Sequence, residues 1–233
     1  MNEGSRIKMP SENTEPPVHY AVALFPGFEA LDVFGPLDAI NMLSRSRKVE
    51  FSVIAATLDP VSTFAAPLFP GQEAKWNPPG SNCGQSIVPT HTFDSPPENL
   101  EVLLVPGGAG TRAPQAYGPV VEFIQKIYPS LRYLLTVCTG AGIAARAGVL
   151  DGRRATTNKR AWNEVIAWRE GVDWVKKARW IDDGNIWTSS GISAGIDMML
   201  AFIAAKYDEE LATLLANRME YTRNNSWDDD PFA

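Results

Sequence analysis

The stretch Leu134-Leu-Thr-Val-Cys138-Thr-Gly140-Ala-Gly142 runs from an apolar strand directly into a helix, with one cysteine at the junction. A continuous apolar run of this kind is typical of a strand buried on both faces of a parallel sheet. Gly140 and Gly142 leave room for the tight passage of the backbone. A side chain on so abrupt a turn is expected at the carboxyl ends of the strands, where α/β proteins build their sites. The sequence therefore predicts an α/β fold with Cys138 on a nucleophile elbow.

The alternation of strand and helix continues on both sides of this stretch. Apolar runs that end at turn residues predict strands near 20–25, 50–56, 101–105, 133–137, 153–156, 178–181 and 185–188. Helical spacing of apolar residues predicts helices near 31–43, 117–128, 139–147, 160–170, 193–206 and 208–218. Strands that alternate with helices along the whole length imply a single doubly wound, mostly parallel sheet flanked by helices.

One domain accounts for most of the chain. We expect a disordered lead-in at 1–17, the α/β domain at 18–220 and a polar C-terminal tail at 221–233. The proline-rich excursion at 57–99 breaks the rhythm, and only 86–88 looks like a strand within it. A long irregular excursion inside a compact domain is usually functional or a surface elaboration, so we expect this one to shape a pocket.

Charge and composition exclude several classes of protein. The 233 residues carry 21 Lys and Arg against 27 Asp and Glu, a net charge of −6 without a basic block, so no nucleic-acid partner is expected. No apolar run approaches the ~20 residues that span a bilayer, and the first residues lack the apolar core of a signal peptide. These features predict a cytoplasmic protein with no membrane partner. The two cysteines and two histidines form no ligand pattern, so neither a metal nor another cofactor is expected.

Several polar residues have more than one interpretation from the sequence alone. The helix after Cys138 directs free N–H groups and its positive dipole end at the sulfur, which favours a nucleophilic thiolate. A single cysteine is also often a small buried core residue. Asp32 is either an acid near the site or a helix-entry cap. Asp197 lies in the first turn of the last large helix and is expected to interact with its dipole. Cys83 lies in loop surroundings and is interpreted as incidental, with a second redox thiol as the alternative.

Three segments together resemble the ThiJ/PfpI superfamily, also called the parkinsonism-associated deglycase superfamily, which is related to class I glutamine amidotransferases. The elbow VCTGA with AGVLDGRRATT at 147–157 resembles its nucleophile region. FPGFEALDVFGP at 25–36 resembles its first strand–helix turn, and VLLVPGG at 102–108 resembles its glycine loop. The resemblance covers 20–205, and LDxxGP with CTGA is most similar to the isocyanide hydratase branch and to domains of some transcriptional regulators. It implies a flavodoxin-like, class I glutamine amidotransferase-like fold.

The resemblance also implies roles for individual residues. Cys138 would be the nucleophile, Asp32 would reach its sulfur and relay a proton, and Thr139 would help to order the site. Negative charge that develops on the substrate would be bound by backbone N–H groups of the glycine loop and the elbow, at Gly107, Gly108, Thr139 and Gly140. Members of the superfamily are commonly homodimers, so a homodimer is expected here.

One position departs from the superfamily pattern. Many members carry a histidine just after the Ala-Thr-Thr run, where this chain has Asn158. Asparagine cannot act as a general base near neutral pH, so a Cys–His relay of the amidotransferase or protease type is not expected. We interpret His19 and His91 as surface residues and not as replacement bases. A hydration that needs only a thiol and a carboxyl remains compatible with the sequence.

The sequence leaves more than one function open. The first hypothesis is a hydro-lyase acting on a small electrophile. The Cys138 thiolate attacks an isocyanide to give a thioimidate, and water guided by Asp32 releases an N-substituted formamide. A non-catalytic or redox-sensing protein that keeps the same oxidisable thiol is an alternative. A glyoxalase III-like hydratase of 2-oxoaldehydes and a biosynthetic enzyme with a reused pocket are further alternatives. Trp76 in the excursion is a candidate for the pocket wall.

Overall fold

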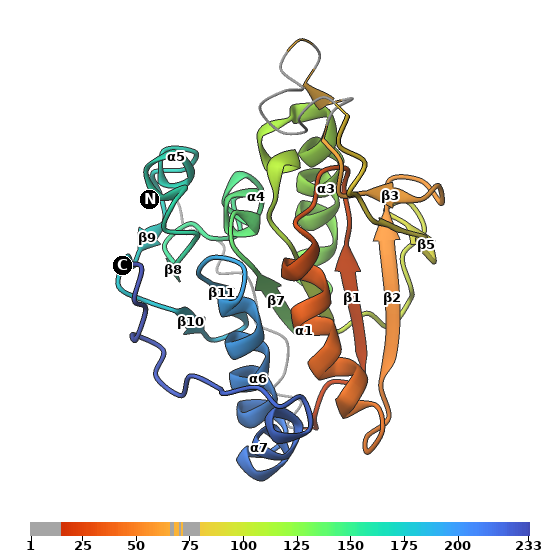
Figure 1. Cartoon of the computed structure of the whole chain (residues 1–233). Coiled ribbons are helices and arrows are strands. Elements are labelled where there is room, and N and C mark those ends of the chain that lie inside the picture. The colour runs from red at the N-terminus through yellow and green to blue at the C-terminus, as the bar shows by residue number, and fades with distance from the viewer. Residues whose placement is uncertain (1–14, 66–67, 70, 72–79) are drawn as a thin grey trace, which may run out of the picture.

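The computed structural model describes residues 15–65, 68–69, 71 and 80–233, which form a seven-stranded sheet flanked by helices (Figure 1). Its strands lie in the order β10-β11-β7-β6-β1-β2-β5, and every pairing is parallel except the antiparallel β10-β11 pair. They are β1 (His19–Ala23), β2 (Glu50–Ala55), β5 (His91–Thr92), β6 (Val102–Val105), β7 (Tyr133–Thr136), β10 (Trp180–Asp183) and β11 (Ile186–Ser189). The predicted doubly wound, mostly parallel sheet is confirmed.

The connections between strands place the helices and the site. The helices are α1 (Ala30–Leu43), α3 (Pro114–Ile127), α4 (Gly140–Arg146), α5 (Trp162–Ile166), α6 (Ala194–Lys206) and α7 (Glu209–Arg218). The β1-to-β2 and β6-to-β7 connections run in opposite directions along the sheet, so right-handed crossovers put α1 and α3 on opposite faces. Figure 1 shows α6 beside α1 in front of the sheet. The strand order therefore reverses between β1 and β6, which is where ligands bind in folds of this type.

The excursion at 57–99 contains more strand than the sequence predicts. β3 (Val61–Ser62) pairs antiparallel with β4 (Ser86–Ile87), and β5 adds a short edge strand to the main sheet beside β2. A two-residue strand is too short to show an alternation of apolar and polar residues. Its pairing depends on partners far along the chain, so the sequence gives no local signal for it. A second small sheet joins β8 (Arg154–Ala155) to β9 (Asp173–Trp174). Trp76, the candidate for the pocket wall, lies outside the described residues.

Both ends of the described chain are held by the domain. Most of the expected lead-in, 1–14, lies outside the described residues, but Arg132 donates a hydrogen bond to the Glu15 carbonyl and the Tyr207 hydroxyl donates one to the Pro17 carbonyl. The C-terminal segment packs against the body, because the Trp227 carbonyl accepts the Arg179 N–H at 2.6 Å. In the part of the chain that the structure describes, no helix has both the length and the apolar character to cross a membrane.

The first turn of α4 packs so closely on β6 that Gly140 has no space for a side chain. A Cβ atom there would lie 2.3 Å from the Val105 carbonyl oxygen and 2.8 Å from that of Pro106, both backbone atoms. We therefore expect Gly140→Ala to lower the free energy of unfolding by about 1–3 kcal/mol.

Gly118, inside α3, is the matched control, because a Cβ atom there would meet no neighbouring group within 4 Å. Alanine favours a helix more than glycine does, but it would precede Pro119, which opposes part of that gain. Gly118→Ala should therefore change the free energy of unfolding by less than about 1 kcal/mol. Urea unfolding measures both variants, and equal midpoints would contradict the close approach at Gly140.

Candidate active site

Cys138 lies on a sharp turn between β7 and α4, as the sequence predicts. Its backbone is left-handed, with φ 59°, which is uncommon for a residue other than glycine. Two hydrogen bonds fix this turn: the Cys138 N–H donates to the Ser190 carbonyl at 3.0 Å, and the Thr157 hydroxyl donates to the Cys138 carbonyl at 2.8 Å. The residue is 5% exposed. The turn thus presents the sulfur to an opening in an otherwise buried setting.

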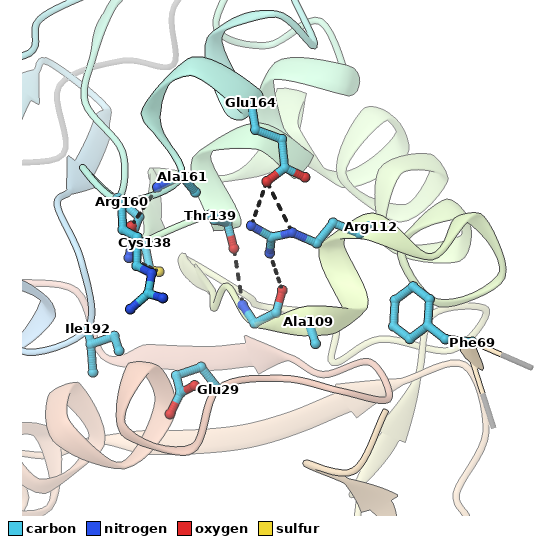
Figure 2. A pocket seen from close by; sticks show the side chains of 12 residues that line it. Glu29, Phe69, Ala109, Arg112, Cys138, Thr139, Arg160, Ala161, Glu164 and Ile192 are labelled. Carbon is cyan, nitrogen blue, oxygen red and sulfur yellow. Dashed lines mark hydrogen bonds and ion pairs between the residues drawn. The ribbon is translucent and has the colours of Figure 1, made fainter. Parts of the chain in front are cut away.

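That opening is a pocket of about 800 Å³. Figure 2 shows side chains from several loops converging on it. It is lined by Glu29, Phe69, Gly108, Ala109, Arg112, Cys138, Thr139, Asn158, Arg160, Ala161, Glu164 and Ile192. Arg112 contacts Glu164 at 2.9 Å and donates to the Gly108 carbonyl at 3.1 Å, which ties the glycine loop to the opposite wall. The pocket is large enough for a small organic molecule beside the thiol.

Asp32 is wholly buried in the first turn of α1, beside Cys138. Its Oδ2 accepts the Gly107 N–H at 2.8 Å, whereas Oδ1 is buried without a hydrogen-bond partner of good geometry among the described residues. It is not the helix-entry cap, because Glu29 occupies that position and makes no side-chain capping bond. Burial, opposed by the Gly107 N–H, raises the pKa of the Asp32 carboxyl to about 7. Asp32 can therefore change its protonation state near neutral pH.

The Cys138 thiol is protonated in the free site. Burial, and then the charge of Asp32, raise its pKa to about 12. Three donors oppose this rise in pKa: the Ile192 N–H, the Asn158 amide and the Thr139 N–H all bond to the sulfur. Burial and Asp32 thus oppose the thiolate that the helix dipole was expected to favour, whereas the Thr139 N–H lowers the pKa of the thiol as expected. The seven-residue α4 begins just after one of these donors, but its contribution is smaller than the cost of removing a thiolate from water.

Asn158 and Ile192 contact the sulfur, although neither is predicted from the sequence as a site residue. The Asn158 Nδ2 donates to the Cys138 Sγ at 3.1 Å, while its Oδ1 accepts the Ala161 N–H at 3.0 Å. The position of Asn158 directly after Ala-Thr-Thr is a sufficient signal that it lies near the sulfur. Because Asn158 is interpreted from the sequence only as the absence of a histidine base, no contact with Cys138 is predicted. Ile192 gives no such signal, because it turns its N–H to the sulfur through a left-handed backbone, φ 44°, that β-branched residues rarely adopt.

The glycines predicted to bind substrate charge use their N–H groups within the protein. The Gly107 N–H bonds to Asp32, the Gly108 N–H donates to the Thr139 Oγ1 at 3.1 Å, and the Gly140 N–H donates to the Val137 carbonyl at 2.9 Å. Each of these three N–H groups is therefore already engaged within the protein, and the role of these glycines in binding substrate charge stays a prediction. Thr139 has the expected central position, because its Oγ1 also accepts from the Thr111 hydroxyl. Its ordering role in catalysis stays a prediction.

Other candidate residues lie away from the pocket. His19 is a half-buried residue of β1 that contacts the Ser52 hydroxyl at 3.2 Å, and not the surface residue that was predicted. His91 bonds to Thr90 in the edge strand. Cys83 is exposed and forms no disulfide. No histidine lines the pocket in the described part of the chain, and no three metal-ligating side chains gather there or elsewhere in that part.

Asp197 lies in the first turn of α6, as the sequence predicts, and it has additional partners. It is wholly buried in α6 and forms an ion pair with Arg179, with its Oδ2 2.6 Å from the Nε. Its Oδ1 accepts the Asn224 N–H at 2.9 Å. Asp197 therefore links α6 to the start of β10 and to the C-terminal segment, partners that the helix dipole alone does not reveal.

Comparisons with known proteins agree with this architecture. The model of the DJ-1/PfpI family matches residues 19–205, close to the 20–205 covered by the sequence motifs. Isonitrile hydratase from Pseudomonas putida is 31% identical over 198 residues, 85% of this chain and 76% of that protein. The HTH-type transcriptional regulator GbdR from Pseudomonas aeruginosa is 31% identical over 140 residues, 60% of this chain and 37% of the regulator. A crystal structure of a ThiJ/PfpI family protein from Pseudomonas syringae has a TM-score of 0.72 at 25% identity, covering 94% of this chain and 84% of that one.

Asp32→Asn tests the electrostatic coupling of the pair. The amide keeps the acceptor for Gly107 but removes the charge that raises the pKa of Cys138. We expect the thiol pKa to fall and alkylation of Cys138 by iodoacetamide at pH 8 to accelerate by about tenfold. Mass spectrometry of the Cys138 peptide over a pH series measures this, with Cys83→Ala as the background in both proteins. An unchanged pH profile would show that the two groups are not coupled.

Proposed function

We propose, from the premise that this chain belongs to the DJ-1/PfpI family, that it hydrates a small isocyanide to an N-substituted formamide. The observation that carries the proposal is a buried carboxyl beside a buried thiol, where the thiol borders a pocket whose described lining has no histidine. A thiol and a carboxyl suffice for adding water across the isocyanide carbon. The similarity to isonitrile hydratase supports the same chemistry.

The first step forms a bond between sulfur and carbon. The ionised Asp32 accepts the thiol proton as Cys138 Sγ attacks the terminal carbon of the isocyanide. The carbon lone pair then takes that proton back from Asp32, which gives a thioformimidate, R–N=CH–S–Cys. The Asp32 Oδ1 suits this exchange because it is the carboxyl oxygen not engaged by Gly107. The sulfur carries negative charge during the transfer, and the N–H donors of Asn158, Thr139 and Ile192 are already directed at it.

The second step returns the enzyme to its starting state. Asp32 removes a proton from water as the oxygen attacks the thioformimidate carbon, and it then passes that proton to the imine nitrogen, which leaves Asp32 ionised again. The tetrahedral intermediate, R–NH–CH(OH)–S–Cys, then breaks its C–S bond. The hydroxyl proton passes through Asp32 to the departing sulfur, and the formamide R–NH–CHO leaves. One water is consumed, and no redox change occurs.

The alternative functions receive less support from the site. Peroxide oxidises thiolates, and Cys138 is buried with a pKa of about 12, so fast redox sensing is disfavoured. The similarity to a transcriptional regulator makes ligand binding without turnover the principal alternative. Hydration of 2-oxoaldehydes is tested in parallel, by chromatography of the 2-hydroxy acid that they would give. The cytoplasmic location and the homodimer stay predictions from the sequence, and the mass in solution would check the latter.

Turnover of small isocyanides tests the proposal directly. Wild-type protein should convert phenyl or cyclohexyl isocyanide to the corresponding formamide, and Cys138→Ala should lose this activity because no sulfur is left to attack. Cys83→Ala is the matched control and should retain wild-type kcat, since that thiol is exposed and is not among the residues that line the pocket. Chromatography of the formamide gives the rate. Full activity of Cys138→Ala, or silence of the wild type with isocyanides alongside turnover of 2-oxoaldehydes, would reject the proposal.

The pH dependence of the reaction tests the role of Asp32. Asp32 must be ionised to accept the thiol proton, and its pKa is about 7. The value of kcat/KM should therefore rise with pH through an apparent pKa near 7, which belongs to the coupled pair. Asp32→Asn should lose this limb and about 100-fold or more in kcat, even though its thiol becomes easier to ionise. A variant that keeps both the limb and the rate would assign the proton transfer to another group.

A further inference from the structure

The C-terminal segment at 224–230 contacts Lys159, which directly follows the site residue Asn158 in the chain. Figure 1 shows it running from α7 back to the side of the molecule that holds β9 and β10. Trp227 accepts backbone N–H groups of Arg179 and Trp180 through its carbonyl. Asn224 donates its N–H to the buried Asp197. These contacts fix the course of the segment and deliver a further acidic side chain, Asp230, into the protein.

Asp230 forms a buried ion pair with Lys159. The Lys159 Nζ lies 3.4 Å from the Asp230 Oδ2, and the two side chains are 4% and 0% exposed. The same ammonium lies within hydrogen-bond distance of four oxygens, Thr156 Oγ1, Thr157 O, Ala178 O and Ser190 Oγ. An ammonium in such a dry position is strongly unfavourable unless an opposite charge accompanies it. Asp230 is the carboxylate that the structure places against it.

Lys159 connects the two backbone segments that hold Cys138. On one side, Thr157 bonds to the Cys138 carbonyl, and Asn158 bonds to its sulfur. On the other side, the Ser190 carbonyl accepts the Cys138 N–H, and Ile192, two residues later, directs its N–H at the sulfur. Because Lys159 bonds to both Thr157 and Ser190, it ties together the donors that face the thiol from opposite sides.

We infer that the Lys159–Asp230 ion pair is a positioning device, through which the C-terminal segment holds Asn158 and Ile192 against the Cys138 sulfur. Neither Lys159 nor Asp230 lines the pocket, so neither touches the substrate. Their effect passes through the two segments that Lys159 connects. The inference deepens the proposed function and rests on it for its effect on turnover, but alkylation of Cys138 can test it without any substrate.

Asp230→Asn is the primary test, because it keeps the size of the side chain and removes its charge. With the Lys159 ammonium unpaired, we expect the connected segments to shift and their donors to leave the sulfur. At pH 8, in a Cys83→Ala background, alkylation of Cys138 by iodoacetamide should slow about tenfold, which is the effect of a rise of about 1 in the thiol pKa. If the protein hydrates isocyanides, kcat should fall about tenfold or more with little change in KM. Asp230→Glu should recover most of both quantities.

Two further variants separate positioning from folding. Asp228→Asn is the matched control, since it removes one carboxylate from the same segment at a residue that accepts a hydrogen bond from the nearby Ser226 hydroxyl. It should leave alkylation and turnover unchanged. If Asp230→Asn fails to fold, the double variant Lys159→Met with Asp230→Leu removes both charges and should fold. It should still show the raised thiol pKa.

The alkylation of the Asp230 variants distinguishes a positioning role of the ion pair from a purely structural one. A folded Asp230→Asn or double variant with the wild-type alkylation profile would overturn the inference, even if its stability were lower, because the pair would then be structural only. A raised thiol pKa that Asp230→Glu reverses would support it. Absence of isocyanide turnover in the wild type would remove the proposed function, yet the alkylation profiles would still decide whether the segment positions the sulfur.

Discussion

The left-handed turn at Cys138 is the constraint on which the site depends. A sulfur at the end of β7 would point into the sheet or the helix layer if the backbone continued as a strand. With φ 59°, it points toward the crevice beside the reversal of strand order instead. The turn persists because its N–H and carbonyl are both bonded, and because α4 begins in direct contact with the end of β6. The close contact between the backbones of α4 and β6 is therefore directly next to Cys138 in the chain.

Burial then sets the chemistry of the pair. Asp32 and Cys138 are both buried away from water, so the charged form of each group is disfavoured and the pKa of each is raised. Asp32 ionises first, since its pKa is far below that of the thiol. In the proposed hydration, the thiolate would form only while substrate is attacked, and the donors around the sulfur would stabilise it at that moment. Such an arrangement would protect the thiol from other reactions when no substrate is bound.

The predictability of each part depends on how local its cause is. The elbow and the parallel sheet follow from an apolar run that meets Cys138 and Gly140, both of them local signals, and the sequence predicts them. The edge strand β5 and the ion pair of Asp230 depend on partners far along the chain, so no nearby pattern reveals them. Only the family resemblance predicts that Asp32 lies near the sulfur. The extent of burial around Cys138, which raises the pKa of the thiol against the effect of the helix start, also has no local signal in the sequence.

The backbone of Ile192 carries a wider consequence. A β-branched residue held at φ 44° costs roughly 1–3 kcal/mol, a large share of the net stability of an ordinary domain. Relaxation of this backbone would recover that free energy, but it would also withdraw the Ile192 N–H from the Cys138 sulfur. Folding stability and the hydrogen bonding of the sulfur therefore oppose each other at position 192.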